Sequence, residues 1–189
     1  MRDSASHGGR AGRTREQLLR AFIGLVVSRG STQVSPADVA ACAGVGRSTL
    51  YTHFGGQREL LEASLAGPCT VLAGTVRAAS SSSDLLPLLR HLRSQSARSR
   101  ATFRDPRDPF LSLWTRCLTR ALRERLRHDP DRMSHRPTIP RQWLAPVLAE
   151  VQLAIIRTWL VDPSGASTEA VADALISTTR RLLCGKLAG

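Results

Sequence analysis

The chain has 189 residues, of which 42% are hydrophobic and 4% aromatic, and this apolar content is enough for one core or two small ones. Its formal net charge is +12, but residues 1–56 hold seven basic and three acidic side chains and residues 57–189 hold twenty and twelve, so the charge gives only mild support for DNA attraction. No apolar run approaches the ~20 residues of a transmembrane helix, and the N-terminus lacks a signal peptide's apolar centre, so we expect a cytoplasmic protein without membrane contact.

Residues 1–12 are rich in Ser, Gly, Arg and His and show no periodicity, which predicts a disordered basic tail. It is either inert or an arm whose Arg10 and Arg13 reach the minor groove or phosphates of DNA. The first helix is expected to begin at Thr14, with Gln17 completing a capping box, and to end at Arg29 before Gly30.

Residues 35–54 predict two short helices joined by a tight turn. Ser35 is a good N-cap and Pro36 suits the first helical position, where its missing N–H is not needed. Gly44 and Gly46 then favour a break, with Val45 between them as an apolar plug. A second helix is expected from Arg47 onward.

The second helix of this pair has one narrow apolar seam, formed by Leu50 and Phe54, four residues apart. Its other side chains are hydrogen-bonding groups: Arg47, Ser48, Thr49, Tyr51, Thr52 and His53. Such a helix, docked on others, can present donors to base edges and phosphates, as the second helix of a helix-turn-helix does. A helical hairpin inside a bundle is the alternative that this pattern alone leaves open.

Residues 14–65 also resemble the N-terminal DNA-binding domain of the TetR family of transcriptional regulators. The matching segments are Arg29-Gly30, Asp38-Val39-Ala40, Ala43-Gly44-Val45, Ser48-Thr49-Leu50-Tyr51, His53-Phe54 and Glu59-Leu60-Leu61. The resemblance implies that Arg47 and Ser48 approach base edges and that Thr49, Tyr51 and His53 hold phosphates. The full set of expected DNA-binding residues is Ser35, Gly46, Arg47, Ser48, Thr49, Tyr51, Thr52, His53 and Arg58.

Four departures from the family pattern lie in this region: Ser31 stands in place of a common aromatic residue, Ala37 takes an often basic position, and two more affect the recognition helix and the helix after it. Gly46 stands where a serine usually caps the recognition helix, so a side-chain contact is missing. Gly55-Gly56-Gln57 replaces the usual cap and lysine, so Arg58 is expected to supply a phosphate contact instead.

Residues 57–189 predict further helices, which makes the expected fold all-α: a three-helix helix-turn-helix domain over 13–56 and a helical-bundle regulatory and dimerisation domain over 57–189. Gly67-Pro68 should kink or split the first of these helices. The others are expected over 84–98, 110–127 and 142–161, with the last one capped by Ser167 or Thr168.

The regulatory domain is expected to hold a small-molecule effector between its helices. The candidate lining residues are Phe103, Phe110, Trp114, Trp143 and Trp159, although aromatic residues at helical spacing also suit plain core. Carboxylates are scarce on the inward faces, which favours a neutral or anionic apolar guest. The family resemblance implies that the last two helices pair with a second subunit, through Val151, Ile155, Trp159, Val171, Leu175, Thr178 and Leu182; the alternative is that they close the monomer's own core.

No residue pattern predicts catalysis, a metal or a cofactor. Cys42, Cys69, Cys117 and Cys184 lie singly, without zinc-site spacing, and the five histidines form no catalytic pattern. We therefore predict a non-enzymatic, ligand-released repressor that binds a palindromic operator in double-stranded DNA as a homodimer. The alternative is a redox-responsive or nucleoid-type DNA-binding protein without a small-molecule ligand, with Cys42 beside the turn as the thiol to watch.

Overall fold

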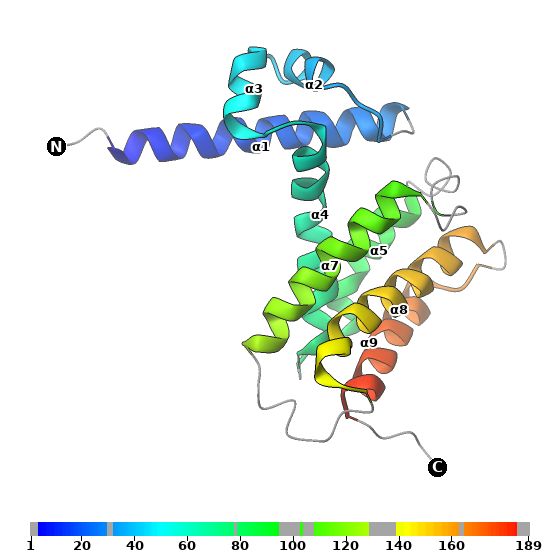
Figure 1. Cartoon of the computed structure of the whole chain (residues 1–189). Coiled ribbons are helices and arrows are strands. Elements are labelled where there is room, and N and C mark those ends of the chain that lie inside the picture. Colours follow the sequence, from blue (N-terminus) through cyan, green and yellow to red (C-terminus); the bar gives the residue numbers. More distant parts are fainter. Residues whose placement is uncertain are drawn as a thin grey trace. The chain divides into compact units, whose positions relative to one another are not determined.

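The computed structural model describes residues 4–29, 32–77, 79–94, 103, 108–128, 139–162 and 165–184. All regular structure in these ranges is helical, as the sequence predicts (Figure 1). The chain divides into two units, Met1–Leu65 and Ala66–Gly189. The division falls inside a helix, α4 (Gln57–Ala73), rather than before it at residue 56, where the sequence suggested it.

Unit 1 contains α1 (Ser4–Arg29), α2 (Pro36–Cys42), α3 (Arg47–His53) and the first part of α4. Figure 1 shows α2 and α3 on the same side of the long helix α1. Apolar side chains from all four helices form one core, which contains Leu18, Phe22, Val34, Val39, Ala40, Ala43, Leu50, Phe54 and Leu60. The short helices α2 and α3 are thus held by tertiary packing, which helices of this length need.

The first helix begins earlier than the sequence suggested. It starts at Ser4, so residues 4–12 are helical rather than a disordered tail, and Thr14 lies within the helix. Once a docked helix is nucleated, each added residue gains a backbone hydrogen bond, and no proline interrupts this stretch. Gln17 forms no capping box; its Nε2 donates to the carbonyl oxygen of Ala43 at 2.6 Å.

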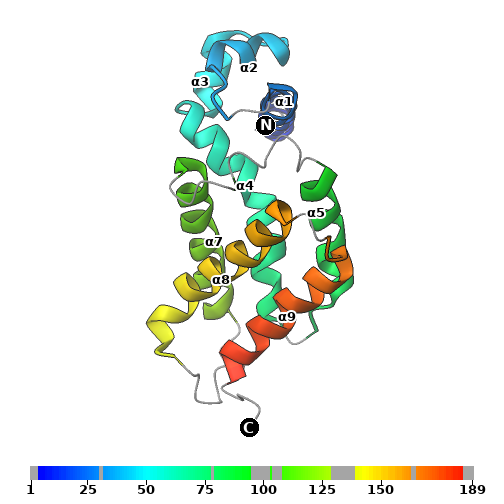
Figure 2. The same ribbon diagram turned by 90° about the vertical axis from the view of Figure 1, so that its right-hand side faces the viewer.

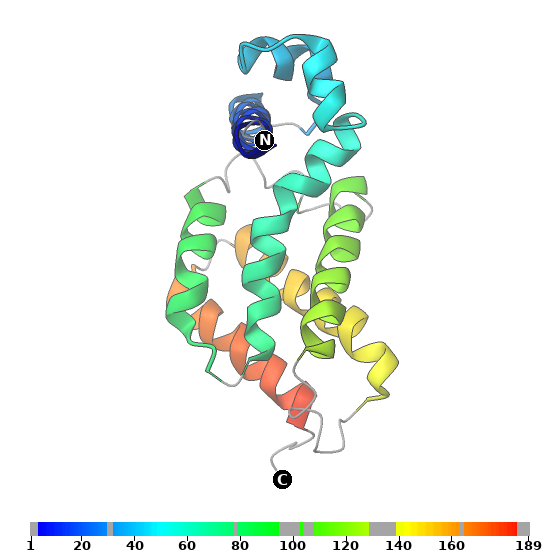
Figure 3. The ribbon, with the colours of Figure 1, turned by 90° about the vertical axis from the view of Figure 1, so that its left-hand side faces the viewer.

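Unit 2 contains the rest of α4, a 3₁₀ turn η1 (Gly74–Val76) and the helices α5 (Ser82–Ser94), α7 (Pro109–Arg127), α8 (Arg141–Val161) and α9 (Thr168–Cys184). Figure 2 shows α8 and α9 side by side, with α7 next to α8 and α5 next to α9. Figure 3 shows the opposite side, where the end of α4 runs between α5 and α7. Ser167 caps α9, because its hydroxyl accepts from the Ala170 N–H at 3.1 Å.

Helix α4 is more continuous than the sequence predicted, and helix α8 is more apolar. Pro68 does not split α4, which is continuous from Gln57 to Ala73. Helix α8 has a mean hydropathy of 1.5 over an 18-residue window, and by length and composition alone it could cross a bilayer. Half of that window is buried inside the structure, because α8 packs on both α7 and α9. A helix with two buried sides is apolar around most of its circumference.

One buried polar cluster lies among the apolar side chains of unit 2. The Gln152 Nε2 on α8 donates to the hydroxyl oxygens of Thr75 at 2.9 Å and Thr179 at 3.1 Å. All three residues are about 1% exposed. Among the described residues, the Gln152 Oε1 has no hydrogen-bond partner. The cluster therefore links η1, α8 and α9 through one amide.

Candidate nucleic-acid interface

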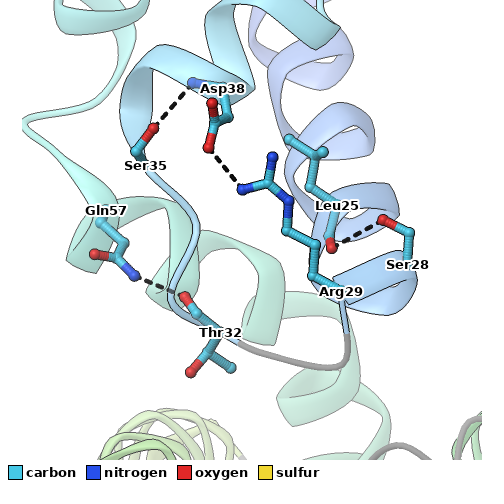
Figure 4. Close-up of polar contacts among 7 residues, drawn as sticks. All are labelled: Leu25, Ser28, Arg29, Thr32, Ser35, Asp38 and Gln57. Carbon is cyan, nitrogen blue, oxygen red and sulfur yellow. Dashed lines mark hydrogen bonds and ion pairs between the residues drawn. The ribbon is translucent and has the colours of Figure 1, made fainter.

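The start of α2 is fixed by a side-chain cap and an ion pair (Figure 4). The Ser35 Oγ accepts from the Asp38 N–H at 3.1 Å, which confirms the predicted N-cap. The Asp38 carboxylate accepts from the Arg29 guanidinium at 2.6 Å. The hydrogen bonds from Arg29 and Ser35 lower the pKa of Asp38 below its ordinary value of 3.8. This carboxylate at the first turn of α2 also suits the helix dipole and ties the end of α1 to α2.

The turn between α2 and α3 depends on one left-handed residue. Gly44 has φ 64°, a conformation that side-chain-bearing residues rarely adopt. The Ala43 N–H donates to the Val39 carbonyl and the Val45 N–H to the Ala40 carbonyl, so the last carbonyls of α2 are satisfied. Val45 packs half-buried against the core as predicted. The turn thereby sets the angle at which α3 leaves α2.

Helix α3 has one buried seam and a broad accessible face. Leu50 is 0% and Phe54 1% exposed, which confirms both as core. On the other side, Arg47, Ser48, Tyr51 and Thr52 are exposed, and Thr49 and His53 are half-buried. Tyr51, a large ring that is 57% exposed, has no packing reason to be there. The accessible face therefore consists of a guanidinium, hydroxyls and an imidazole.

Contacts from α1 and α4 hold this face in position, and sequence reasoning did not identify them. The Arg15 guanidinium lies over the Phe54 ring, 4.6 Å from its centroid. The Gln57 Nε2 donates to the Thr32 carbonyl at 2.6 Å, joining the start of α4 to the segment before α2 (Figure 4). These residues are distant in the sequence, so no local pattern predicts the pairs.

The other predicted DNA-binding residues lie at the helix starts. Gly46 is the N-cap of α3 and supplies no side-chain hydrogen bond, as expected. Arg58 is exposed and its Nε lies 3.2 Å from the Glu62 Oε1. A phosphate contact from Arg58 would have to break this ion pair, and breaking an exposed pair costs little free energy. The Gly55 N–H donates to the Glu59 Oε2 at 2.7 Å, so a carboxylate in the first turn of α4 holds the glycine segment that precedes the helix.

The five aromatic residues predicted to line a pocket lie in different environments in the described part of unit 2. Phe103, Phe110 and Trp114 pack on one another, with ring centroids 5.9 and 5.8 Å from Trp114, and Trp114 is buried. Trp143 is 55% exposed. The Trp159 Nε1 donates to the Ala166 carbonyl at 2.8 Å. Phe103 and Trp114 are core, as the alternative interpretation allowed, and Phe110 is half-buried beside Trp114.

A cavity of about 780 Å³ among the described residues lies elsewhere in unit 2. Its lining contains none of the five predicted aromatics. It is formed by Thr70, Val71, Ala73, Gly74, Thr75, Arg77, Ala79, Ser80, Ser81, Asp84, Leu85, Ala121, Glu124, Arg125 and His128. These residues come from separate segments and include many polar groups, so hydrophobic periodicity gives no signal for them.

The predicted dimer residues separate into two groups. Trp159, Val171 and Leu175 are at most 5% exposed within unit 2, so little of their surface is left for a partner. The reason is that α8 and α9 pack on each other and on α7 and α5 through these positions. Val151, Ile155, Thr178 and Leu182 are half-buried and keep accessible surface.

The thiols differ in exposure. Cys42, at the end of α2, and Cys184 are exposed, whereas Cys69 and Cys117 are buried. Burial raises the pKa of the Cys69 thiol to about 12, and the nearby Cys117 adds to this shift. Because the thiolate is the reactive form, Cys69 is an inert core residue.

Comparison with known proteins points to one family. Residues 16–64 match the family described as "Bacterial regulatory proteins, tetR family". The fold is similar to that of a TetR transcriptional regulator from Streptococcus agalactiae 2603V, with 23% identity, a TM-score of 0.57, and coverage of 94% of this chain and 99% of the other. A TetR regulator from Rhodococcus sp. RHA1 gives 22% identity, a TM-score of 0.55 and coverage of 94% and 98%.

A third similar structure contains a ligand. It is Thermus thermophilus FadR, a TetR family transcriptional repressor in complex with lauroyl-CoA, with 20% identity, a TM-score of 0.53 and coverage of 93% of this chain and 96% of the other. No curated protein sequence matches the chain. The match over 16–64 covers α2, α3 and the parts of α1 and α4 that adjoin them.

Proposed function

We propose that this chain is a cytoplasmic repressor of the TetR family that binds a palindromic operator as a homodimer and is released by a small molecule, because residues 16–64 match the model of that family and the fold is similar to those of TetR regulators. The observation that carries this proposal is the accessible face of α3, where hydrogen-bonding side chains surround the exposed ring of Tyr51. A family of transcriptional regulators also agrees with the expectation that the chain is not an enzyme.

DNA recognition is divided between the two ends of α3. Arg47 and Ser48, in its first turn, read base edges in the major groove, where a guanidinium can pair with two acceptors of guanine. Thr49, Tyr51 and His53 hold the phosphates and set the register, and Ser35, Gly46, Thr52 and Arg58 border this surface. Phosphate contacts carry no sequence information, so the two groups should respond differently to mutation.

Dimerisation uses the accessible sides of α8 and α9. Val151 and Ile155 on α8 and Thr178 and Leu182 on α9 are half-buried in the single chain, and Ala154 beside them is exposed. Apolar and small side chains at accessible positions favour close packing against a second copy. A two-fold dimer implies an operator of two inverted half-sites about one helical turn apart, ~34–36 Å, or somewhat more.

The effector is proposed to bind in unit 2. Two observations support this: the 780 Å³ cavity, which is of the size that small ligands occupy, and the lauroyl-CoA bound by a similar protein. Release of DNA follows if the ligand favours a head spacing that does not fit successive major grooves.

Fluorescence anisotropy on the intergenic DNA beside the gene, with random competitor, tests this proposal. Arg47→Ala should lower operator affinity by about 1–3 kcal/mol and relax sequence preference, whereas Tyr51→Phe should weaken operator and random DNA alike. Arg123→Ala, an exposed arginine on α7, is the matched control and should change neither.

Two results would contradict the assignment. Equal losses on operator and random DNA for Arg47→Ala would show that this residue does not read bases. Binding that competitor abolishes and added salt erases would leave only phosphate contacts, which is the behaviour of a nucleoid-type protein.

A further inference from the structure

The cavity in unit 2 has both apolar and charged walls. Its lining comes from the end of α4, from η1 and the segment after it, from the first turn of α5, and from the last turns of α7 (Figure 3). Val71, Leu85 and Ala121 supply apolar wall, whereas Arg77, Arg125 and other polar groups share the lining. A guest of this cavity therefore needs both an apolar part and a polar or charged part.

The acidic groups in the lining already have partners. The Glu124 carboxylate lies 3.1 Å from the Arg127 guanidinium and 3.5 Å from the His128 Nδ1. The Asp84 carboxylate accepts from the Ser81 N–H at 3.0 Å, which caps α5. These carboxylates are thus engaged in holding the ends of α7 and α5.

The two arginines of the lining, unlike its carboxylates, are not engaged by other side chains in the described part of the chain. Arg77 is exposed and Arg125 half-buried, and in the described part of the chain neither guanidinium has a carboxylate or other hydrogen-bond partner. A guanidinium that faces a cavity without an internal counter-ion is suited to a bidentate bond with a carboxylate or phosphate of a ligand. The carboxylates of Asp84 and Glu124 balance the formal charge of the lining, but they are engaged at the ends of α5 and α7, so the two guanidinium groups keep free donors for a ligand.

We propose that this cavity binds an anionic amphiphile, whose carboxylate or phosphate is held by Arg77 and Arg125 and whose apolar part lies against Val71 and Leu85. The proposal rests on the proposed function, because it names the chemical class of the effector. The anionic group is the shared chemistry of carboxylates and phosphate monoesters, and the experiment below separates these two.

Isothermal titration calorimetry without DNA tests the site with four probes that share one alkyl chain: octanoate, octyl phosphate, octan-1-ol and octylammonium. At fixed ionic strength, at least one of the two anions should bind roughly tenfold more tightly than the alcohol, and the ammonium should bind most weakly. The tighter of the two anions identifies the preferred head group.

Variants locate the interaction. Arg77→Gln and Arg125→Gln should each weaken the tighter anion about tenfold and leave the alcohol unchanged. Arg123→Gln, a matched change on the outer side of α7, should leave both unchanged. Circular dichroism checks that the variants keep their helical content.

The proposal is overturned if neither anion binds better than the alcohol, or if Arg123→Gln causes the same loss as the other two variants, since that would indicate general charge attraction. DNA anisotropy on the same samples separates the two levels. Operator binding without anion preference refutes this inference alone, whereas anion preference without operator binding refutes the proposed function.

Discussion

Replacement of Gly46 by serine should stabilise the recognition helix. Gly46 is the N-cap of α3, with φ −69° and ψ 151°, which any residue can adopt, and it provides no side-chain hydrogen bond. A Cβ at this position would lie 3.7 Å from the Ser48 Oγ and 3.8 Å from the Thr49 Oγ1, which is ordinary contact. Serine adds a cap bond worth a few tenths of a kcal/mol over glycine, and lower entropy of the unfolded chain adds about 0.4–1 kcal/mol. We expect about 0.5–1.5 kcal/mol in total.

The assay is urea unfolding monitored on unit 1, together with amide hydrogen exchange in α3 and operator binding. Gly46→Ser should raise the unfolding free energy, slow exchange in the first turn and tighten operator binding, because a better-ordered helix loses less entropy on DNA. Gly44→Ser is the matched control: there is space for a side chain, but φ 64° costs about 1–2 kcal/mol, so it should destabilise. An unchanged or lower stability for Gly46→Ser would refute the reasoning.

Three further predictions concern stability and reactivity. Since the pKa of Asp38 is lowered in the folded state, the ionised carboxylate contributes to stability above pH 3.8, and this contribution is lost as pH falls through the folded pKa. Lowering the pH from about 6 to about 3 should therefore reduce the melting temperature of the wild type more than that of Asp38→Asn, as thermal melts can measure. Iodoacetamide at about pH 8 should label Cys42 in the native protein and Cys69 only after denaturation, as peptide mass spectrometry can check; labelling of native Cys69 would contradict its burial. In urea unfolding, Thr75→Val should lower the unfolding free energy by about 1–3 kcal/mol, because it leaves a Gln152 amide hydrogen unpaired. Gln152→Leu should lower it less, since it removes the whole amide, including the unpartnered Oε1. A larger loss for Gln152→Leu than for Thr75→Val would contradict this reasoning.

Local signals in the sequence predicted much of the structure of α2, α3 and the turn between them. Three features depend only on residues within one or two turns of each other: the Ser35 cap, the glycine turn, and the seam of Leu50 and Phe54. Such local interactions can be predicted from neighbouring residues in the sequence. The same holds for α8, expected from residue 142 and observed from Arg141. The roles of the exposed α3 residues in DNA binding stay predictions.

Features that depend on long-range packing could not be predicted. The position of Gln17 predicted a local capping box, but its amide donates to the Ala43 carbonyl, 26 residues away, at 2.6 Å. Trp114 and Trp159 look alike in sequence as pocket candidates, and only the packing shows that both are buried in core contacts. The cavity is lined partly by polar residues such as Arg77 and Arg125, and no periodic pattern in the sequence predicts that they lie close together.

The amide of Gln152 also has a consequence for how α8 can be turned about its own axis. A helix that is apolar on most sides could settle in several rotational settings, because hydrophobic contact is not directional. In this chain only the observed setting brings the amide to Thr75 and Thr179 together, and any other would leave it unpaired in the core. The buried amide thus favours one orientation of α8, and that orientation determines which side of the helix stays accessible, the side that we propose meets a second subunit.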